Sequence, residues 1–156
     1  MLTRRSFIAS TAGLALTPLA AQAGLFSKDG PVFATRHGAI RGTDPVAYFT
    51  DGAPMAGSRD IESEWMGATW RFVSADNRSA FEADPEAFAP QFGGYCAWAV
   101  SRNYTASTDP DAWRIVDGKL YLNYSLGVQR QWEGDVPGNI ALGNANWPGL
   151  LADLSA

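Results

Sequence analysis

Cysteine and histidine each occur only once in this chain of 156 residues, as Cys96 and His37. A single cysteine excludes an internal disulfide, and one Cys with one His argues against a structural zinc site, which needs four close nitrogen or sulfur ligands. The sequence also lacks a Gly-x-Ser-x-Gly elbow, an HExxH helix, a phosphate-binding glycine loop and a recognisable Ser-His-Asp set. We therefore favour a protein that is not an enzyme.

A long hydrophobic run is missing as well. The most apolar stretch, residues 7–19, is short and contains Gly, Thr and Pro, which argues against a membrane span. It follows the arginine pair of residues 3–8 (TRRSFI) and precedes Ala21-Gln22-Ala23, which has the form of a signal-peptidase site. We predict a twin-arginine signal peptide over residues 1–23 and export to the periplasm by the twin-arginine machinery. An ordinary secretory signal and an uncleaved anchor are the alternatives.

Basic residues are few once this leader is removed. The whole chain has 12 Lys and Arg against 16 Asp and Glu, and the leader contains Arg4 and Arg5 but no acid, which leaves 10 against 16 and a net charge of −6. No cluster of Lys and Arg remains in the sequence. Nucleic acids and anionic membranes are therefore poor candidates as partners.

Aromatic residues are plentiful, and the mature chain has the length of one domain. Aromatic and β-branched runs predict strands near 46–49, 61–65, 69–73, 95–100, 113–116 and 119–123. Gly67 and the pair Asp117-Gly118 indicate hairpin turns. Ser74 and Ser125 are typical N-caps for helices near 75–83 and 126–145. In the second region we expect one helix over 126–133 and a weaker one over 136–146, which stops at Trp147-Pro148-Gly149. The sequence thus predicts an α+β fold, a small antiparallel sheet of hairpins with helices packed on it.

Several motifs of this chain, taken together, resemble the YHS domain, and in particular the exported YHS-domain proteins of bacteria. They are Asp44-Pro45-Val46-Ala47-Tyr48-Phe49, Trp65-x-Gly67-x-x-Trp70-x-Phe72-x-Ser74, Phe81-x-x-Asp84-Pro85, Gly93-Gly94-Tyr95-Cys96, the run 113–123 and Trp147-Pro148. The resemblance implies a YHS-like domain over residues 40–148, between a lead-in at 24–39 and a C-terminal tail at 149–156.

Cysteine-bearing YHS domains are linked to metal binding, but this chain departs from their pattern. Ala47, Val73 and Asn77 occupy the positions of the family cysteines. The Tyr-His-Ser triplet that names the family matches Trp65-Met66-Gly67. The resemblance therefore implies the fold more strongly than a thiolate metal site.

The candidate ligands for a metal are Cys96, His37, Met66 and Met55. Soft sulfur and imidazole ligands suit copper, so a His-Cys-Met copper site is one hypothesis. The alternative is that Cys96 is a buried apolar side chain and His37 a surface or structural one. A second kind of site is an aromatic pocket for a small ligand or a haem-like ring, with Asp44 and Tyr48 as its polar groups.

Two functions follow from these candidates. The first is an exported binding or interaction module that keeps the YHS-like scaffold and takes a small ligand or a periplasmic protein partner. The second is a periplasmic transition-metal protein, with copper as the metal. The sequence favours the first because the family cysteines are absent.

Overall fold

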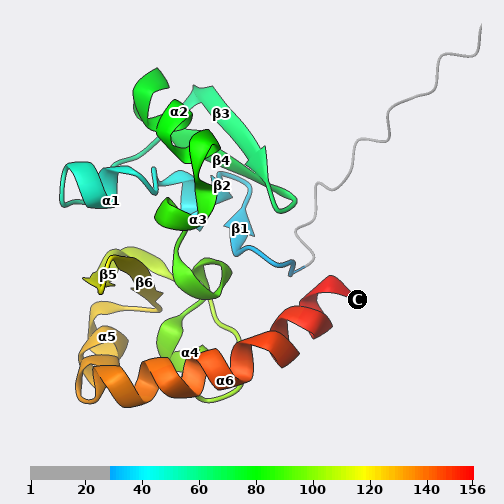
Figure 1. The fold of residues 1–156 in the computed structure, drawn as a ribbon, viewed down its shortest axis with the longest axis vertical. Helices are drawn as coiled ribbons and strands as arrows, with labels where there is room; N and C mark the ends of the chain where they lie inside the picture. The colour runs from blue at the N-terminus through cyan, green and yellow to red at the C-terminus, as the bar shows by residue number, and fades with distance from the viewer. Residues whose placement is uncertain (1–28) are drawn as a thin grey trace, which may run out of the picture.

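The computed structural model describes residues 29–156, so the predicted leader at 1–23 and its cleavage site lie outside the described residues. Figure 1 shows a chain of short hairpins and helices that ends in one long helix. The α+β class predicted from the sequence is confirmed. Within residues 29–156, no helix combines the length and the apolarity that a membrane span requires.

The strands form three separate two-stranded antiparallel sheets rather than the single sheet that we predicted. β1 (Ala34–Thr35) pairs with β2 (Gly38–Ala39), β3 (Ser58–Trp65) with β4 (Ala68–Phe72), and β5 (Asp109–Val116) with β6 (Lys119–Asn123). The two longer hairpins match the predicted strands at 61–65, 69–73, 113–116 and 119–123. Helices and 3-10 turns, rather than further strand pairing, join the three ribbons (Figure 1).

Two predicted strands are helices. The stretch at 46–49 falls in α1 (Ala47–Thr50), because the Asp44 carboxylate accepts hydrogen bonds from the amides of Val46 and Ala47 and caps a first turn. The stretch at 95–100 holds α4 (Ala97–Ser101), which follows the 3-10 turn η2 (Gln91–Gly94). A short apolar run with no polar face does not distinguish a buried strand from a buried helix.

The predicted helix at 75–83 is α2 (Ala75–Ala83), and the Ser74 side chain caps it by accepting from the Asn77 amide at 3.1 Å. α3 (Pro85–Phe88) follows at once, and a 3-10 turn, η1 (Ile40–Gly42), precedes α1. The two helices predicted within 126–146 are present as α5 (Leu126–Glu133) and α6 (Val136–Ser155).

α6 does not stop at Trp147 but continues through Pro148 to Ser155, so residues 149–156 are mostly helix. The apolar side chains of Trp147, Leu150 and Leu154 pack against the core and hold these last turns in place. Proline removes one helical hydrogen bond, whose acceptor would be Asn144. Both Asn144 and Pro148 lie on the exposed side of α6, where water can take the place of the missing donor.

The core consists of two clusters of buried side chains. The first joins α1, the β3–β4 hairpin and α2, and its largest members are Trp70, Tyr48, Phe72 and Phe81. The second joins η2, α4, α5 and α6 around Trp132, Phe92 and Tyr121. β6 belongs to both clusters, because Leu120 and Leu122 pack in the first while Tyr121 packs in the second.

Candidate functional site: an aromatic cleft

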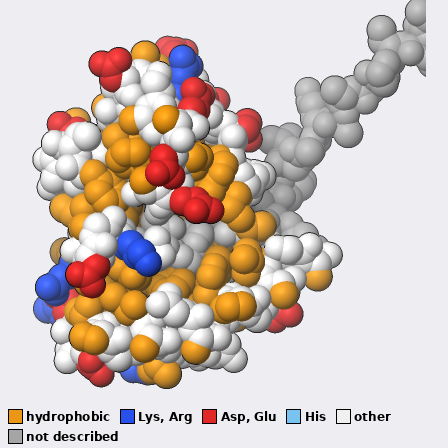
Figure 2. Space-filling model, in the orientation of Figure 1, with side chains coloured by type: hydrophobic (Ala, Val, Ile, Leu, Met, Phe, Trp, Pro, Cys, Tyr) orange, Lys and Arg blue, Asp and Glu red, His pale blue; other side chains and the backbone are white. Residues whose placement is uncertain are grey.

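A cleft of about 350 Å³ lies where residues of the two clusters face each other. Figure 2 shows hydrophobic side chains around a hollow on this side of the molecule, with acidic and basic side chains at its edge. We call it the aromatic cleft. Its lining residues are Pro31, Val32, Trp65, Met66, Trp70, Glu86, Ala89, Pro90, Gln91, Phe92, Gly93, Lys119, Trp147 and Leu151.

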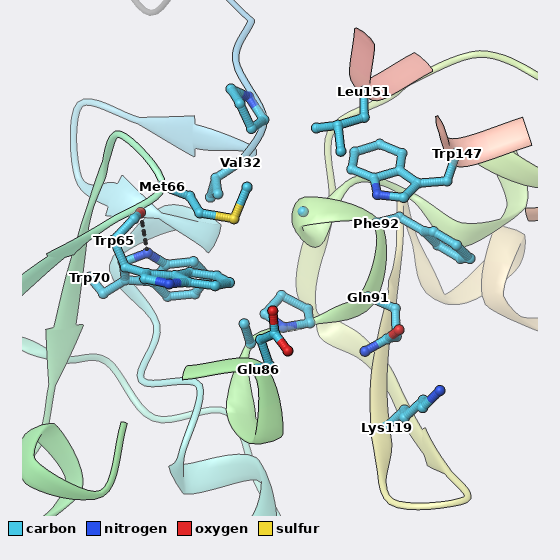
Figure 3. A pocket seen from close by; sticks show the side chains of 14 residues that line it. Val32, Trp65, Met66, Trp70, Glu86, Gln91, Phe92, Lys119, Trp147 and Leu151 are labelled. Atoms are coloured by element: carbon cyan, nitrogen blue, oxygen red, sulfur yellow. Dashed lines mark hydrogen bonds between the residues drawn. The ribbon is translucent and has the colours of Figure 1, made fainter. Parts of the chain in front are cut away.

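The first wall comes from the tip of the β3–β4 hairpin. Trp65 and Trp70 lie with their ring centroids 5.9 Å apart, and the Trp70 Nε1–H donates to the Trp65 carbonyl at 3.1 Å. Trp70 is fully buried and packs on Phe81 of α2, which fixes its ring. Met66, at the turn of the hairpin, directs its sulfur into the cleft in front of the two indoles (Figure 3).

The opposite wall comes from η2 and α6. The rings of Phe92 and Trp147 are 6.0 Å apart, and Leu151 follows Trp147 by one turn of α6 (Figure 3). Phe92 adopts a left-handed backbone conformation, with φ of 58°, which any side chain with a Cβ adopts only at a cost in energy. Its ring fits against α6 because Gly143 has no side chain: a Cβ there would lie 2.6 Å from Phe92 Cζ.

Gly93 brings the start of the described chain to the cleft. The Phe33 amide donates to the Gly93 carbonyl at 2.8 Å, so residues 31–33 run directly alongside η2. A Cβ at Gly93 would collide with the Pro31 carbonyl, and the φ of Gly93 is +60°. Glycine is the residue that allows both the close approach and the left-handed turn.

Three polar side chains occupy one edge of the cleft. Glu86 comes from the first turn of α3, Gln91 begins η2 and Lys119 begins β6. Figure 3 shows all three on the same side of the aromatic walls. Glu86 and Lys119 are exposed, whereas Gln91 is half-buried. The cleft therefore combines two apolar walls with an edge that can hydrogen-bond or pair with charge, the composition expected of a small-ligand site.

Cys96 lies in the core and does not line the cleft. It is 1% exposed, and its Sγ donates to Asn123 Oδ1 at 3.6 Å and accepts from the Tyr124 amide at 3.2 Å. Burial raises the pKa of the thiol, although amide hydrogen bonds oppose that shift. A reactive or metal-binding thiol needs an electropositive and open setting, and Cys96 lacks both. The interpretation of Cys96 as a buried apolar side chain is the one that fits this geometry.

The other candidate metal ligands have separate surroundings. His37 lies in the turn between β1 and β2, where its Nε2 accepts from the neighbouring Arg36 Nε at 3.1 Å. Met55 is 42% exposed and Met66 is 45% exposed, and only Met66 lines the cleft. Among residues 29–156, no group of three or more His, Cys, Asp or Glu side chains is arranged to hold a metal ion.

Asp44 and Tyr48 are buried in the first cluster instead of facing a pocket. The Asp44 carboxylate is fully buried and accepts four hydrogen bonds, from the amides of Val46, Ala47 and Val73 and from the Asn77 side chain. The Tyr48 hydroxyl donates to the Pro110 carbonyl at 2.8 Å. Burial, and then the nearby negative charges of Asp111 and Asp109, raise the pKa of Tyr48 far above its usual value. Both residues thus hold the fold together.

A second hollow of about 420 Å³ lies beside residues 107–110. Arg41, Ser107, Asp109, Pro110 and Tyr124 line it. The Arg41 Nε–H is already bound to the Thr108 carbonyl at 2.8 Å, and Asp109 Oδ1 accepts from the Asp111 amide. Arg41 also stacks over Phe33. Because Arg41 and Asp109 already make hydrogen bonds within the protein, this hollow is a weaker candidate for a ligand site than the aromatic cleft.

Comparison of the chain with protein-family models, with curated proteins and with solved structures finds no match. The resemblance to YHS domains stays a prediction, and the geometry of the cleft has to support the functional argument alone.

Sequence reasoning anticipated an aromatic pocket but placed different polar groups in it. Asp44 and Tyr48 are buried elsewhere, whereas Glu86, Gln91 and Lys119 form the polar edge. The lining comes from residues between 31 and 151 that only the folded chain brings together. One local signal was available: methionine at the first position of a two-residue turn is unusual, because such turns favour Asn, Asp or Gly.

Proposed function

We propose that this chain is an exported, non-enzymatic binding protein that takes a flat, apolar small molecule in the aromatic cleft. The observation that carries the proposal is the pair of facing walls, with Trp65 and Met66 on one side and Phe92, Trp147 and Leu151 on the other. Rings favour offset or edge contacts with other rings, so a planar ligand can contact both walls at once. Its polar substituents would face Glu86, Gln91 and Lys119.

The volume of the cleft supports a small ligand over a large cofactor. About 350 Å³ lies at the lower end of the range of small-molecule sites. Residues such as Trp70 and Phe92, which are buried and held by ring contacts, give the site rigid walls before any ligand arrives. A site formed in advance loses little entropy on binding, which favours affinity.

A titration with a matched pair of naphthalenes tests the cleft. We expect 2-naphthoate or 2-(aminomethyl)naphthalene to change the tryptophan fluorescence in a saturable way, because Trp65 and Trp147 line the site. Preference for the anion would point to Lys119, and preference for the cation to Glu86. Trp147→Ala should weaken binding about tenfold, because it removes one aromatic contact with the ligand and a contact worth about 1.4 kcal/mol corresponds to a factor of ten in affinity.

Tyr124→Ala is the matched control for this titration. Tyr124 is an exposed aromatic residue, 57% accessible, that does not line the aromatic cleft. Its replacement should leave the affinity unchanged. A wild-type protein that gives no saturable signal with either naphthalene, or a Trp147→Ala variant that binds as tightly as wild type, would contradict the proposal.

Export to the periplasm is part of the proposal and is supported by the arginine pair and the Ala21-Gln22-Ala23 site. Protein purified from the periplasm should have an intact mass that begins near Gly24, and replacing Arg4 and Arg5 by lysine should abolish its accumulation there. Periplasmic accumulation of the lysine variant would refute the twin-arginine route.

The copper alternative is tested on the same periplasmic protein. Elemental analysis should find a stoichiometric metal if the alternative holds, and Cys96→Ala or His37→Ala should remove it. The surroundings of Cys96 and His37 do not support such a site. Cys96 hydrogen-bonds to the Asn123 side chain and the Tyr124 amide, and His37 hydrogen-bonds to Arg36, so neither residue is bonded to another candidate ligand. We therefore rank copper below the aromatic ligand.

A further inference from the structure

The two long hairpins of this protein turn in the same way but with different residues. Trp65 pairs with Ala68 across Met66-Gly67, and Val116 pairs with Lys119 across Asp117-Gly118. The φ angles are 50° and 74° in the first turn and 51° and 75° in the second. Two positive φ angles are the mark of a type I′ turn, for which Asn-Gly and Asp-Gly are the preferred pairs. The β5–β6 turn follows the preference, and the β3–β4 turn does not.

Nothing in the core accounts for methionine at this turn. Met66 is 45% exposed and packs in neither of the two buried clusters. An L-residue with a long side chain is disfavoured in the left-handed region, whereas Asn and Asp tolerate it through local hydrogen bonds. Met66 therefore occupies a strained backbone position that packing in the buried core does not explain. Such strain is concentrated at functional sites in proteins.

The position of the Met66 side chain suggests what it does. Its sulfur points into the cleft between the indoles of Trp65 and Trp70 and the wall made by Phe92 and Trp147 (Figure 3). A thioether is polarizable, has three rotatable bonds and makes favourable contacts with aromatic rings. It can adjust to the edge or the face of a ring that lies between the two walls.

We propose that Met66 is the specificity-determining residue of the cleft, a thioether that closes over a planar aromatic ligand from the tip of the β3–β4 hairpin. The proposal rests on the function proposed above and names the ligand as an aromatic ring system rather than an aliphatic one. The turn thus sacrifices local stability for contact with the ligand.

The test is Met66→Asn, which should move stability and affinity in opposite directions. Asn suits the type I′ turn, so the melting temperature should rise by about 2–4 °C. Loss of the sulfur–ring contact should weaken 2-naphthoate binding roughly three- to tenfold. Met66→Leu keeps an apolar side chain of similar reach but lacks the sulfur, so it should keep the wild-type melting temperature and bind 2-naphthoate more weakly than wild type and more tightly than Met66→Asn.

Asp117→Met is the reciprocal control at the equivalent position of the other turn. It should lower the melting temperature by about 2–4 °C and leave the affinity for 2-naphthoate unchanged. An aliphatic probe, cyclohexanecarboxylate, should bind more weakly than 2-naphthoate to wild type and should bind equally to wild type and Met66→Asn.

The outcomes separate the two proposals. In one outcome, wild type binds 2-naphthoate, Trp147→Ala loses that binding and Met66→Asn keeps it. The cleft is then a binding site, but the role that we propose for Met66 is wrong. If Met66→Asn loses affinity and also melts at a lower temperature, Met66 supports the hairpin and the inference is again wrong. If wild type binds neither naphthalene, both proposals are overturned.

Discussion

Asp44→Asn should lower the free energy of unfolding by about 3–5 kcal/mol, the largest effect that we expect from a single isosteric substitution in this protein. One carboxylate oxygen accepts from the amides of Val46 and Ala47, and the other accepts from Val73 and the Asn77 side chain. An asparagine has only one acceptor oxygen. In either orientation its NH₂ group faces two donors, which are left unpaired inside the core.

Urea unfolding followed by tryptophan fluorescence measures this loss. Asp76→Asn is the matched control, because Asp76 also lies near the N-terminus of α2 but is exposed and contributes only through the helix dipole. Its replacement should cost about 0.3–1 kcal/mol. If Asp44→Asn lowered the free energy of unfolding by less than about 1 kcal/mol, the four hydrogen bonds would contribute less to stability than we infer.

Gly143→Ala should destabilise the protein by about 1–3 kcal/mol, although the same change in an ordinary helix is stabilising. The new Cβ would lie 2.6 Å from Phe92 Cζ and 3.0 Å from Cε2. The Phe92 ring has little room to move, since it is buried between Tyr121 and Trp147 and its backbone is left-handed. Overpacking therefore outweighs the gain in helix propensity.

Gly149 provides the control within the same helix. A Cβ at Gly149 meets nothing within 4 Å, so Gly149→Ala should stabilise the protein by about 0.5–1 kcal/mol. Opposite signs for the two substitutions in thermal or urea unfolding are the expected result. If Gly143→Ala were also stabilising, the contact between α6 and Phe92 would be looser than the structure indicates.

The sequence predicted best what depends on neighbouring residues. Asp117-Gly118 marked one hairpin, and Ser74 and Ser125 marked the helix starts that the structure has. Each of these signals acts over three or four residues, through a turn or a cap. Local chemistry of this kind can be read without knowing the rest of the fold.

The errors concern segments whose structure is decided by distant contacts. The run 95–100 is apolar throughout, and what makes part of it helical is its burial between β6 and α6. Pro148 indicated a helix end, but the packing of Leu150 and Leu154 outweighs the lost hydrogen bond. The aromatic cleft depends on the same long-range contacts, so its polar edge could not be assigned from the sequence.

β6 couples the two buried clusters to each other. Successive residues of this strand are committed to different clusters, with Leu120 and Leu122 in one and Tyr121 in the other. Loss of either cluster removes part of the side-chain packing that keeps β6 in place and so weakens the other cluster. We therefore expect the two halves that form the walls of the cleft to unfold together, as one cooperative unit, rather than as two autonomous pieces.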